Sequence, residues 1–139
     1  MGRVVAIDFG LKRTGIAVTD ELKITANGLT TLDTPALLPF LKNYIATEPV
    51  EIIVVGEPLN LNGTETHATE AAGKLVQELL KLFPQIPVER EDETYTSKMA
   101  MQTLVTLGVS KKKRRDKKLI DKVSATLILQ SFLQRKGIW

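Results

Sequence analysis

The chain contains no cysteine and a single histidine among its 139 residues. Without cysteine it can form no disulfide, no thiolate metal site and no cysteine nucleophile. One histidine makes a histidine-based triad or a histidine-rich zinc site hard to build. An active site in this chain would therefore have to be built from carboxylates.

Long apolar runs are also missing. No stretch approaches the roughly 20 consecutive apolar residues of a membrane span, and Asp8 lies where the apolar region of a secretion signal would have to form. We therefore expect a cytoplasmic protein with no membrane partner. Hydrophobic residues make up 43% and charged residues 25% of the chain, which is typical of a folded globular protein. The length predicts one domain over residues 1–139.

The net charge of +3 is unevenly distributed along the chain. Residues 111–118 hold seven basic side chains and one acid, a local charge of +6, so the rest of the chain carries −3. Such a block favours contact with the phosphates of a nucleic acid. The alternative is an open, solvated loop whose like charges repel one another. The basic residues are Lys111, Lys112, Lys113, Arg114, Arg115, Lys117 and Lys118.

The pattern of apolar residues predicts five strands and four helices. The strands are expected over residues 3–8, 14–19, 24–32, 51–56 and 86–91, and the helices from residue 35 onward and over residues 66–83, 94–107 and 117–134. Three short strands joined by tight turns indicate an antiparallel meander, and the alternating helices and strands after them indicate a mixed sheet. We therefore predict an α/β fold with helices on both faces of a mixed sheet. This order of elements resembles the ribonuclease-H-like fold.

Candidate acids follow two of the predicted strands. Asp8 closes the first strand, at the edge where ligands bind in open α/β sheets, although an aspartate can also simply begin a turn. Asp92 and Glu93 follow the fifth strand. Their alternative role is to complement the dipole of the helix that comes next.

A further candidate, Asp121, lies inside the predicted last helix. Ser124 and Ala125 are one turn beyond it and are small enough to let this acid reach the edge of the sheet. The alternative is an exposed acid that pairs with the lysines nearby. The residues expected to mark the buried side of this helix are Ile120, Val123, Leu127 and Leu133.

In the predicted order, Asp8 and Glu93 end adjacent strands, and the last helix crosses the edge that they share. Three carboxylates without histidine or cysteine suit Mg²⁺ or Mn²⁺ and not zinc. Paired metals can activate a water and stabilise the leaving oxygen of a phosphodiester, and the basic segment would hold the polyanion beside them. The acids and the basic block thus indicate the same chemistry, hydrolysis of a nucleic acid.

Four segments of the chain resemble the YqgF family, also called RuvX, of small bacterial ribonuclease-H-like nucleases. Residues 8–17 (DFGLKRTGIA) are similar to the family's opening motif, Asp-x-Gly-x-x-Arg-x-Gly-x-Ala. Residues 55–65 (VGEPLNLNGTE) are similar to its Gly-x-Pro-x-x-x-x-Gly-x-Glu segment, and residues 92–97 (DETYTS) to its Asp-Glu-Arg-x-x-Ser motif. Residues 118–125 (KLIDKVSA) resemble the helix that bears the family's last acid. The likeness covers nearly the whole chain, residues 3–134.

The resemblance implies a metal-dependent hydrolase that resolves Holliday junctions or processes the 5′ end of pre-16S rRNA. It implies that Asp8, Glu93 and Asp121 are catalytic and bind Mg²⁺ or Mn²⁺. Asp92 is a lower-ranked candidate ligand, and Arg13 would lie near a phosphate. The partner would be pre-rRNA or branched DNA, bound by a monomer or a homodimer. Processing of rRNA is the main interpretation and junction resolution the first alternative.

Departures from the family pattern bear on catalysis. Thr94 stands where the family has an arginine, and Arg90 is a candidate to replace that cation. Glu57 occupies the variable place in Gly-x-Pro and is an alternative ligand from the fourth strand. The last helix offers only one acid toward the site. The threonine at position 94 keeps open a non-catalytic nucleic-acid-binding module. An actin-like or sugar-kinase ATPase is disfavoured, because such a protein needs a duplicated domain to enclose its nucleotide.

Overall fold

The computed structural model describes residues 2–57, 67–92 and 96–139. In chain order, the elements are β1 (Arg3–Phe9), β2 (Arg13–Thr19), β3 (Ala26–Asp33), the 3₁₀ helix η1 (Thr34–Ala36), α1 (Leu37–Thr47), β4 (Val50–Glu57), α2 (His67–Leu82), β5 (Val88–Asp92), α3 (Thr96–Thr106), α4 (Lys111–Arg114) and α5 (Lys117–Arg135). Every predicted strand and helix is present. The two additions are η1 and the short helix α4, which lies in the basic segment. None of the helices in these ranges is long and apolar enough to cross a membrane.

The strands form a mixed sheet in the order β3-β2-β1-β4-β5. β1 pairs antiparallel with β2, and β2 with β3, while β4 runs parallel to both β1 and β5. The predicted meander and mixed sheet are therefore confirmed. The predicted adjacency is wrong, because β4 separates β1, which leads to Asp8, from β5, which leads to Glu93. Apolar side chains cover both faces of β4, as expected for a strand in the interior of a sheet.

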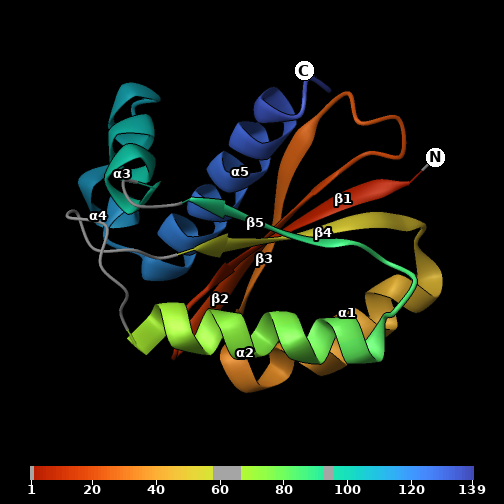
Figure 1. Ribbon diagram of the computed structural model, residues 1–139. Coiled ribbons are helices and arrows are strands. Elements are labelled where there is room, and N and C mark those ends of the chain that lie inside the picture. Colours follow the sequence, from red (N-terminus) through yellow and green to blue (C-terminus); the bar gives the residue numbers. More distant parts are fainter. Residues whose placement is uncertain (1, 58–66, 93–95) are drawn as a thin grey trace.

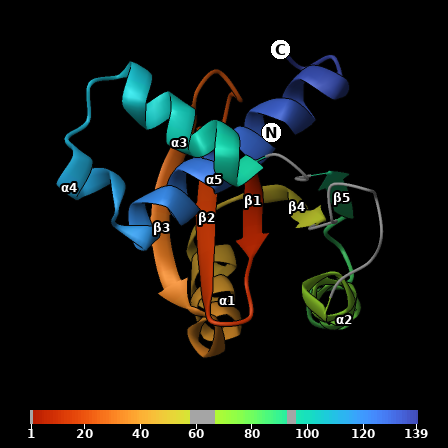
Figure 2. The ribbon, with the colours of Figure 1, turned by 90° about the vertical axis from the view of Figure 1, so that its left-hand side faces the viewer.

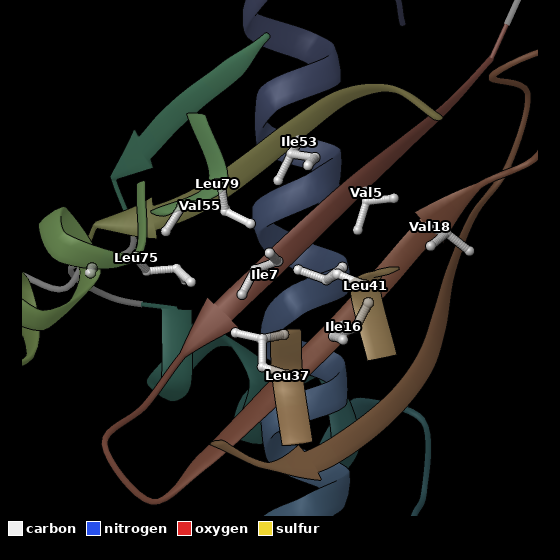
Figure 3. Close-up of a cluster of buried hydrophobic side chains, with 11 residues drawn as sticks. Val5, Ile7, Ile16, Val18, Leu37, Leu41, Ile53, Val55, Leu75 and Leu79 are labelled. Carbon is white, nitrogen blue, oxygen red and sulfur yellow. The ribbon is translucent and has the colours of Figure 1, made fainter. Parts of the chain in front are cut away.

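Helices cover both faces of the sheet, as predicted (Figure 1). α1 and α2 lie against one face, and α5 crosses the other, where it packs on β1, β2 and β3 (Figure 2). The core on the side of α1 and α2 contains Val5, Ile7, Ile16, Val18, Leu37, Leu41, Ile53, Val55, Ala72, Leu75 and Leu79 (Figure 3). The core under α5 contains Val4, Ala6, Ala17, Val54, Ala125, Ile128, Leu129, Phe132 and Leu133.

The central strand β1 shows how the sequence determines the two faces. Side chains alternate along a strand, so Val5 and Ile7 pack toward α1 and α2 while Val4 and Ala6 pack under α5. The same alternation places Asp8 on the α5 face, close to the end of the strand. Asp8 therefore lies at the rim of the core under α5.

The buried side of α5 differs from the predicted one. Ile120, Val123 and Leu127 are only half-buried. The buried residues of the helix are Ser124, Ala125, Ile128, Leu129, Phe132 and Leu133. The prediction followed the large apolar residues, whereas the small side chains of Ser124 and Ala125 allow the start of α5 to lie close to the sheet. Asp121 is one turn before these two residues, so it lies at the N-terminal end of the buried side of α5.

Acidic residues of β5 fix this strand to the end of α5. Glu91 is 6% exposed and accepts hydrogen bonds from Ser131 Oγ at 2.6 Å and from Arg135 Nε at 2.7 Å. Glu89 pairs with Lys136 at 2.9 Å. A buried carboxylate is stable only with such partners. The face of β5 that carries Glu89 and Glu91 therefore packs toward the end of α5.

Candidate active site

The carboxyl ends of β1, β4 and β5 lie at one edge of the sheet, because these strands are parallel. The same edge carries the turn from β1 to β2, which requires glycine at position 10. A Cβ at Gly10 would overlap the carbonyl oxygen of Arg13. Thr34 supports the turn by donating its hydroxyl to the carbonyl oxygen of Gly10 at 2.6 Å. The backbone on either side of the turn therefore holds Asp8 and Arg13 in place.

Gly15 brings α5 against this edge. It is the direct cross-strand partner of Asp8. A Cβ at Gly15 would overlap the carbonyl oxygen of Asp121 and lie 2.6 Å from its carbonyl carbon. Cross-strand partners share one face of a sheet, so Asp8, Gly15 and Asp121 meet on the α5 side. The fold thus places two of the three predicted catalytic acids, from opposite ends of the chain, on the same face of this edge.

Arg13 contacts one of these acids directly. Its Nε donates to Asp121 Oδ2 at 3.1 Å, and each of the two side chains is 24% exposed. Charge-assisted hydrogen bonds are stronger than neutral ones, so this contact orients the Asp121 carboxylate. The sequence placed Arg13 near a phosphate and gave no sign of this ion pair, because 108 positions separate the two residues.

A buried hydroxyl lies one helical turn beyond Asp121. Ser124 is 1% exposed, and its Oγ has no hydrogen-bond partner in the part of the chain that the structure describes. Leaving such a group unpaired costs about 1–3 kcal/mol. Asp8, Asp121 and this hydroxyl all carry oxygen donors. Such a set fits Mg²⁺ or Mn²⁺ and does not fit zinc.

Other predicted site residues lie at or beyond the ends of β4 and β5. Glu93 and Thr94 fall outside the described residues. Glu57 and Asp92 are register partners at the ends of these two strands, so their backbones lie side by side at the edge that carries Asp8. Within residues 2–57, 67–92 and 96–139, no group of three or more acids or histidines could hold a metal. The three-acid set therefore stays a prediction that depends on Glu93.

Arg90 lies on the wrong face to replace the arginine that the family has at position 94. Glu91 faces α5, where it bonds Ser131 and Arg135, and alternation along β5 places Arg90 on the opposite face. Asp8 lies on the α5 face. On that face, Arg13 is the cation that contacts Asp121.

The basic segment is partly helical and is not the open loop of the alternative interpretation. Ser110 caps α4 by accepting the backbone N–H of Lys113 at 3.3 Å, and Asp116 caps α5 by accepting that of Lys118 at 3.0 Å. Such caps satisfy backbone donors at the start of a helix. All of the predicted nucleic-acid-binding residues in this segment except Arg114 are exposed. The two caps therefore hold the backbone of these cations in helical turns. The second of these helices, α5, also carries Asp121.

The arrangement of strands and helices is shared with solved structures of RuvC. A chain described as "T. thermophilus RuvC in complex with Holliday junction substrate" matches with a TM-score of 0.56 and 19% identity, over 99% of this chain and 97% of that one. A second, "Thermus thermophilus RuvC structure", matches with a TM-score of 0.53. The fold is therefore the mixed α/β, ribonuclease-H-like one that the order of elements predicted.

Sequence comparison defines the family. The model described as "RuvX: Holliday junction resolvase" matches residues 2–135, and the chain belongs to this family, as its motifs predicted. A relative from Christiangramia forsetii is 50% identical over 133 residues, which cover 96% of this chain and 98% of the relative. A relative from Porphyromonas gingivalis is also 50% identical over 133 residues, 96% of each chain. Both are named "Putative pre-16S rRNA nuclease", so the family is one of nucleases.

Proposed function

We propose that this chain hydrolyses phosphodiester bonds of structured nucleic acid with Mg²⁺ or Mn²⁺, and that Asp8 and Asp121 hold the cation. The observation that carries the proposal is the close packing at Gly15, which puts these two acids on one face of the sheet edge. Glu93 would complete the set of ligands, with Asp92 as a further candidate. The chain would act as one domain over residues 1–139.

Residues of the protein would bind and orient the substrate around this site. A bound divalent ion supplies activation of the attacking water and stabilisation of the leaving oxygen. Asp8 and Asp121 would fix its position against the sheet, and the Arg13 guanidinium beside Asp121 would pair with the phosphate that is cut. The exposed cations of residues 111–118 would bind the backbone away from the cut.

The substrate that we favour is precursor 16S rRNA, because relatives 50% identical to this chain carry the name of a pre-16S rRNA nuclease. Such processing would take place in the cytoplasm. A second candidate is a Holliday junction, which the description of the family supports. Resolving a junction would require a symmetric homodimer with two sites, whereas a monomer could process rRNA. A third candidate, a binding module without catalysis, rests on Thr94 standing in place of an arginine.

The experiment that separates these candidates offers two labelled substrates to the wild-type protein. One is the 5′ segment of precursor 16S rRNA and the other is a four-way DNA junction, each with Mg²⁺, with Mn²⁺ and with EDTA. Metal-dependent cutting of the RNA alone supports rRNA processing, and cutting of the junction alone supports the second candidate. Tight binding without cutting of either would contradict the proposed hydrolysis and support the binding module.

Neutralising the basic segment is expected to weaken binding to all nucleic-acid sequences alike. Affinity falls as salt rises, and each phosphate contact that is lost makes the slope of log affinity against log salt less steep by about 0.7–0.9. The variant replaces Lys111, Lys112, Lys113, Arg114 and Arg115 with glutamine, and binding is followed by fluorescence anisotropy from low to high NaCl. A control variant carries Lys42→Gln and Lys81→Gln, on α1 and α2. A wild-type slope in the segment variant would remove this segment from the binding surface.

Arg13→Gln is expected to tighten Mn²⁺ binding by about three- to tenfold, because it removes a cation that competes for Asp121. The free Mn²⁺ signal in electron paramagnetic resonance measures this affinity without substrate. Arg3→Gln is a matched control, since Arg3 pairs with Glu48 at 3.2 Å at the other end of β1. Unchanged or weaker Mn²⁺ binding in Arg13→Gln would contradict this competition between Arg13 and the cation for Asp121.

A further inference from the structure

A cavity of about 240 Å³ opens between β3 and the start of α5. Leu29, Thr30 and Thr31 line it on the side of β3, and Asp116, Lys118 and Lys122 line it on the side of α5. We infer that this cavity, here called the β3–α5 groove, binds a backbone phosphate of the substrate. The inference rests on the proposed function, and it adds Lys122 to the residues that bind nucleic acid.

Gly28 positions one of the two lysines of the groove. A Cβ at Gly28 would lie 2.6 Å from Lys122 Cγ and 3.2 Å from its Cδ. The stem of Lys122 therefore lies against the bare backbone of β3, and the side chain is half-buried. An apolar stem held in this way directs the ammonium group along a defined path. Among the described residues, this ammonium group makes no ion pair.

Thr31 fixes the other lysine relative to the strand. Its hydroxyl donates to the carbonyl oxygen of Lys118 at 2.6 Å, which ties the first turn of α5 to β3. Lys118 and Lys122 are four positions apart, so their side chains lie on the same side of the helix. Asp116 brings a negative charge to the groove, but its carboxylate is engaged by the backbone N–H of Lys118. The two ammonium groups outweigh this single acid.

The chemistry of the groove points to a phosphodiester. Ammonium groups are donors that suit a phosphate oxygen. The groove lysines are also close in the chain to both parts of the proposed binding surface: residues 111–115 precede Lys118, and Asp121 lies between Lys118 and Lys122. A strand bound by the basic segment and cut beside Asp121 is therefore expected to pass close to the groove.

The test measures binding of fluorescein-labelled precursor 16S rRNA 5′ segment by anisotropy, in EDTA so that nothing is cut. Lys122→Gln is expected to weaken binding by about tenfold. It should also make the slope of log affinity against log salt less steep by about 0.7. Gly28→Ala changes no charge but displaces the stem of Lys122, so it should produce much of the same loss. The matched controls are Lys42→Gln for the charge and Gly73→Ala for the added methyl, because a Cβ at Gly73 meets nothing within 4 Å.

Crosslinking gives a second readout. Because the chain has no cysteine, a single introduced cysteine can be labelled specifically. A photo-crosslinker attached to Leu29→Cys, an exposed position that lines the groove, should label the bound RNA, whereas the same reagent on Gln77→Cys, on α2, should not. Wild-type binding by both Lys122→Gln and Gly28→Ala, or no crosslink from position 29, would overturn the groove as a phosphate site. That result would leave the proposed function intact, because the proposed hydrolysis is tested separately, by metal-dependent cutting in the wild type and its loss in Asp8→Asn.

Discussion

Asp8→Asn is expected to lower turnover on the order of 10³-fold, because a metal ion contributes several kcal/mol of transition-state stabilisation and each 1.4 kcal/mol is a factor of ten. The substitution keeps the shape of the side chain and removes the charge that would hold the cation. Binding of the nucleic acid should change by no more than about twofold, since the cations that bind the backbone lie elsewhere. Single-turnover cleavage and anisotropy measure the two quantities separately.

Asp20→Asn is the matched control for this experiment. Asp20 follows β2 at the opposite edge of the sheet, where its carboxylate accepts the backbone N–H groups of Ile24 at 2.7 Å and Thr25 at 2.8 Å. An asparagine oxygen can accept the same bonds, so turnover should stay at the wild-type level. Equal losses in Asp8→Asn and Asp20→Asn would show that the effect is general and not chemical. Wild-type turnover in Asp8→Asn would exclude Asp8 from catalysis.

Gly15→Ala is expected to destabilise the fold by roughly 1–3 kcal/mol, the usual cost of forcing an atom into a packed contact. The new methyl group would overlap the backbone of Asp121, which cannot rotate away as a side chain can. To relieve the overlap, α5 would have to move off β2 and carry Asp121 away from Asp8. Turnover should therefore fall even where most of the protein remains folded, and denaturant unfolding followed by circular dichroism measures the loss of stability.

Gly73→Ala on α2 is the control for Gly15→Ala. It removes the backbone flexibility of a glycine without forcing the new methyl group against another atom. This glycine lies in a helix and a Cβ there meets nothing within 4 Å, so the substitution should stabilise the protein by about 0.5–1 kcal/mol. If Gly15→Ala unfolds at the same denaturant concentration as the wild type and retains its turnover, the close packing of α5 on β2 does not position the site.

Much of the site follows from local patterns in the sequence. A β-branched run that ends in an acid predicted both β1 and the position of Asp8 at its end. Gly15 also had a readable signal, because a glycine inside a β-branched strand often marks the close approach of another backbone. Asp121 was predicted from the small residues that follow it, and those residues do allow α5 to approach the sheet.

The errors concern arrangements that no local pattern specifies. The insertion of β4 between β1 and β5 depends on how the chain crosses over the sheet, and periodicity along one strand does not determine its neighbours. The ion pair of Arg13 with Asp121 joins two distant segments and becomes visible only after α5 has packed. The short helix α4 was missed because seven basic residues in eight suggest repulsion, whereas the caps from Ser110 and Asp116 favour helix on either side.

The central claim, that Asp8 and Asp121 hold one cation that supports cleavage, is tested most directly with a double-mutant cycle. Mn²⁺-dependent cleavage of the precursor 16S rRNA 5′ segment is measured for the wild type, Asp8→Asn, Asp121→Asn and the double variant. When two residues act as a unit, replacing the second causes no further loss of turnover once the first has been replaced. The double variant should therefore be about as slow as either single variant. Wild-type turnover in Asp121→Asn, or losses that multiply in the double variant, would contradict a shared cation.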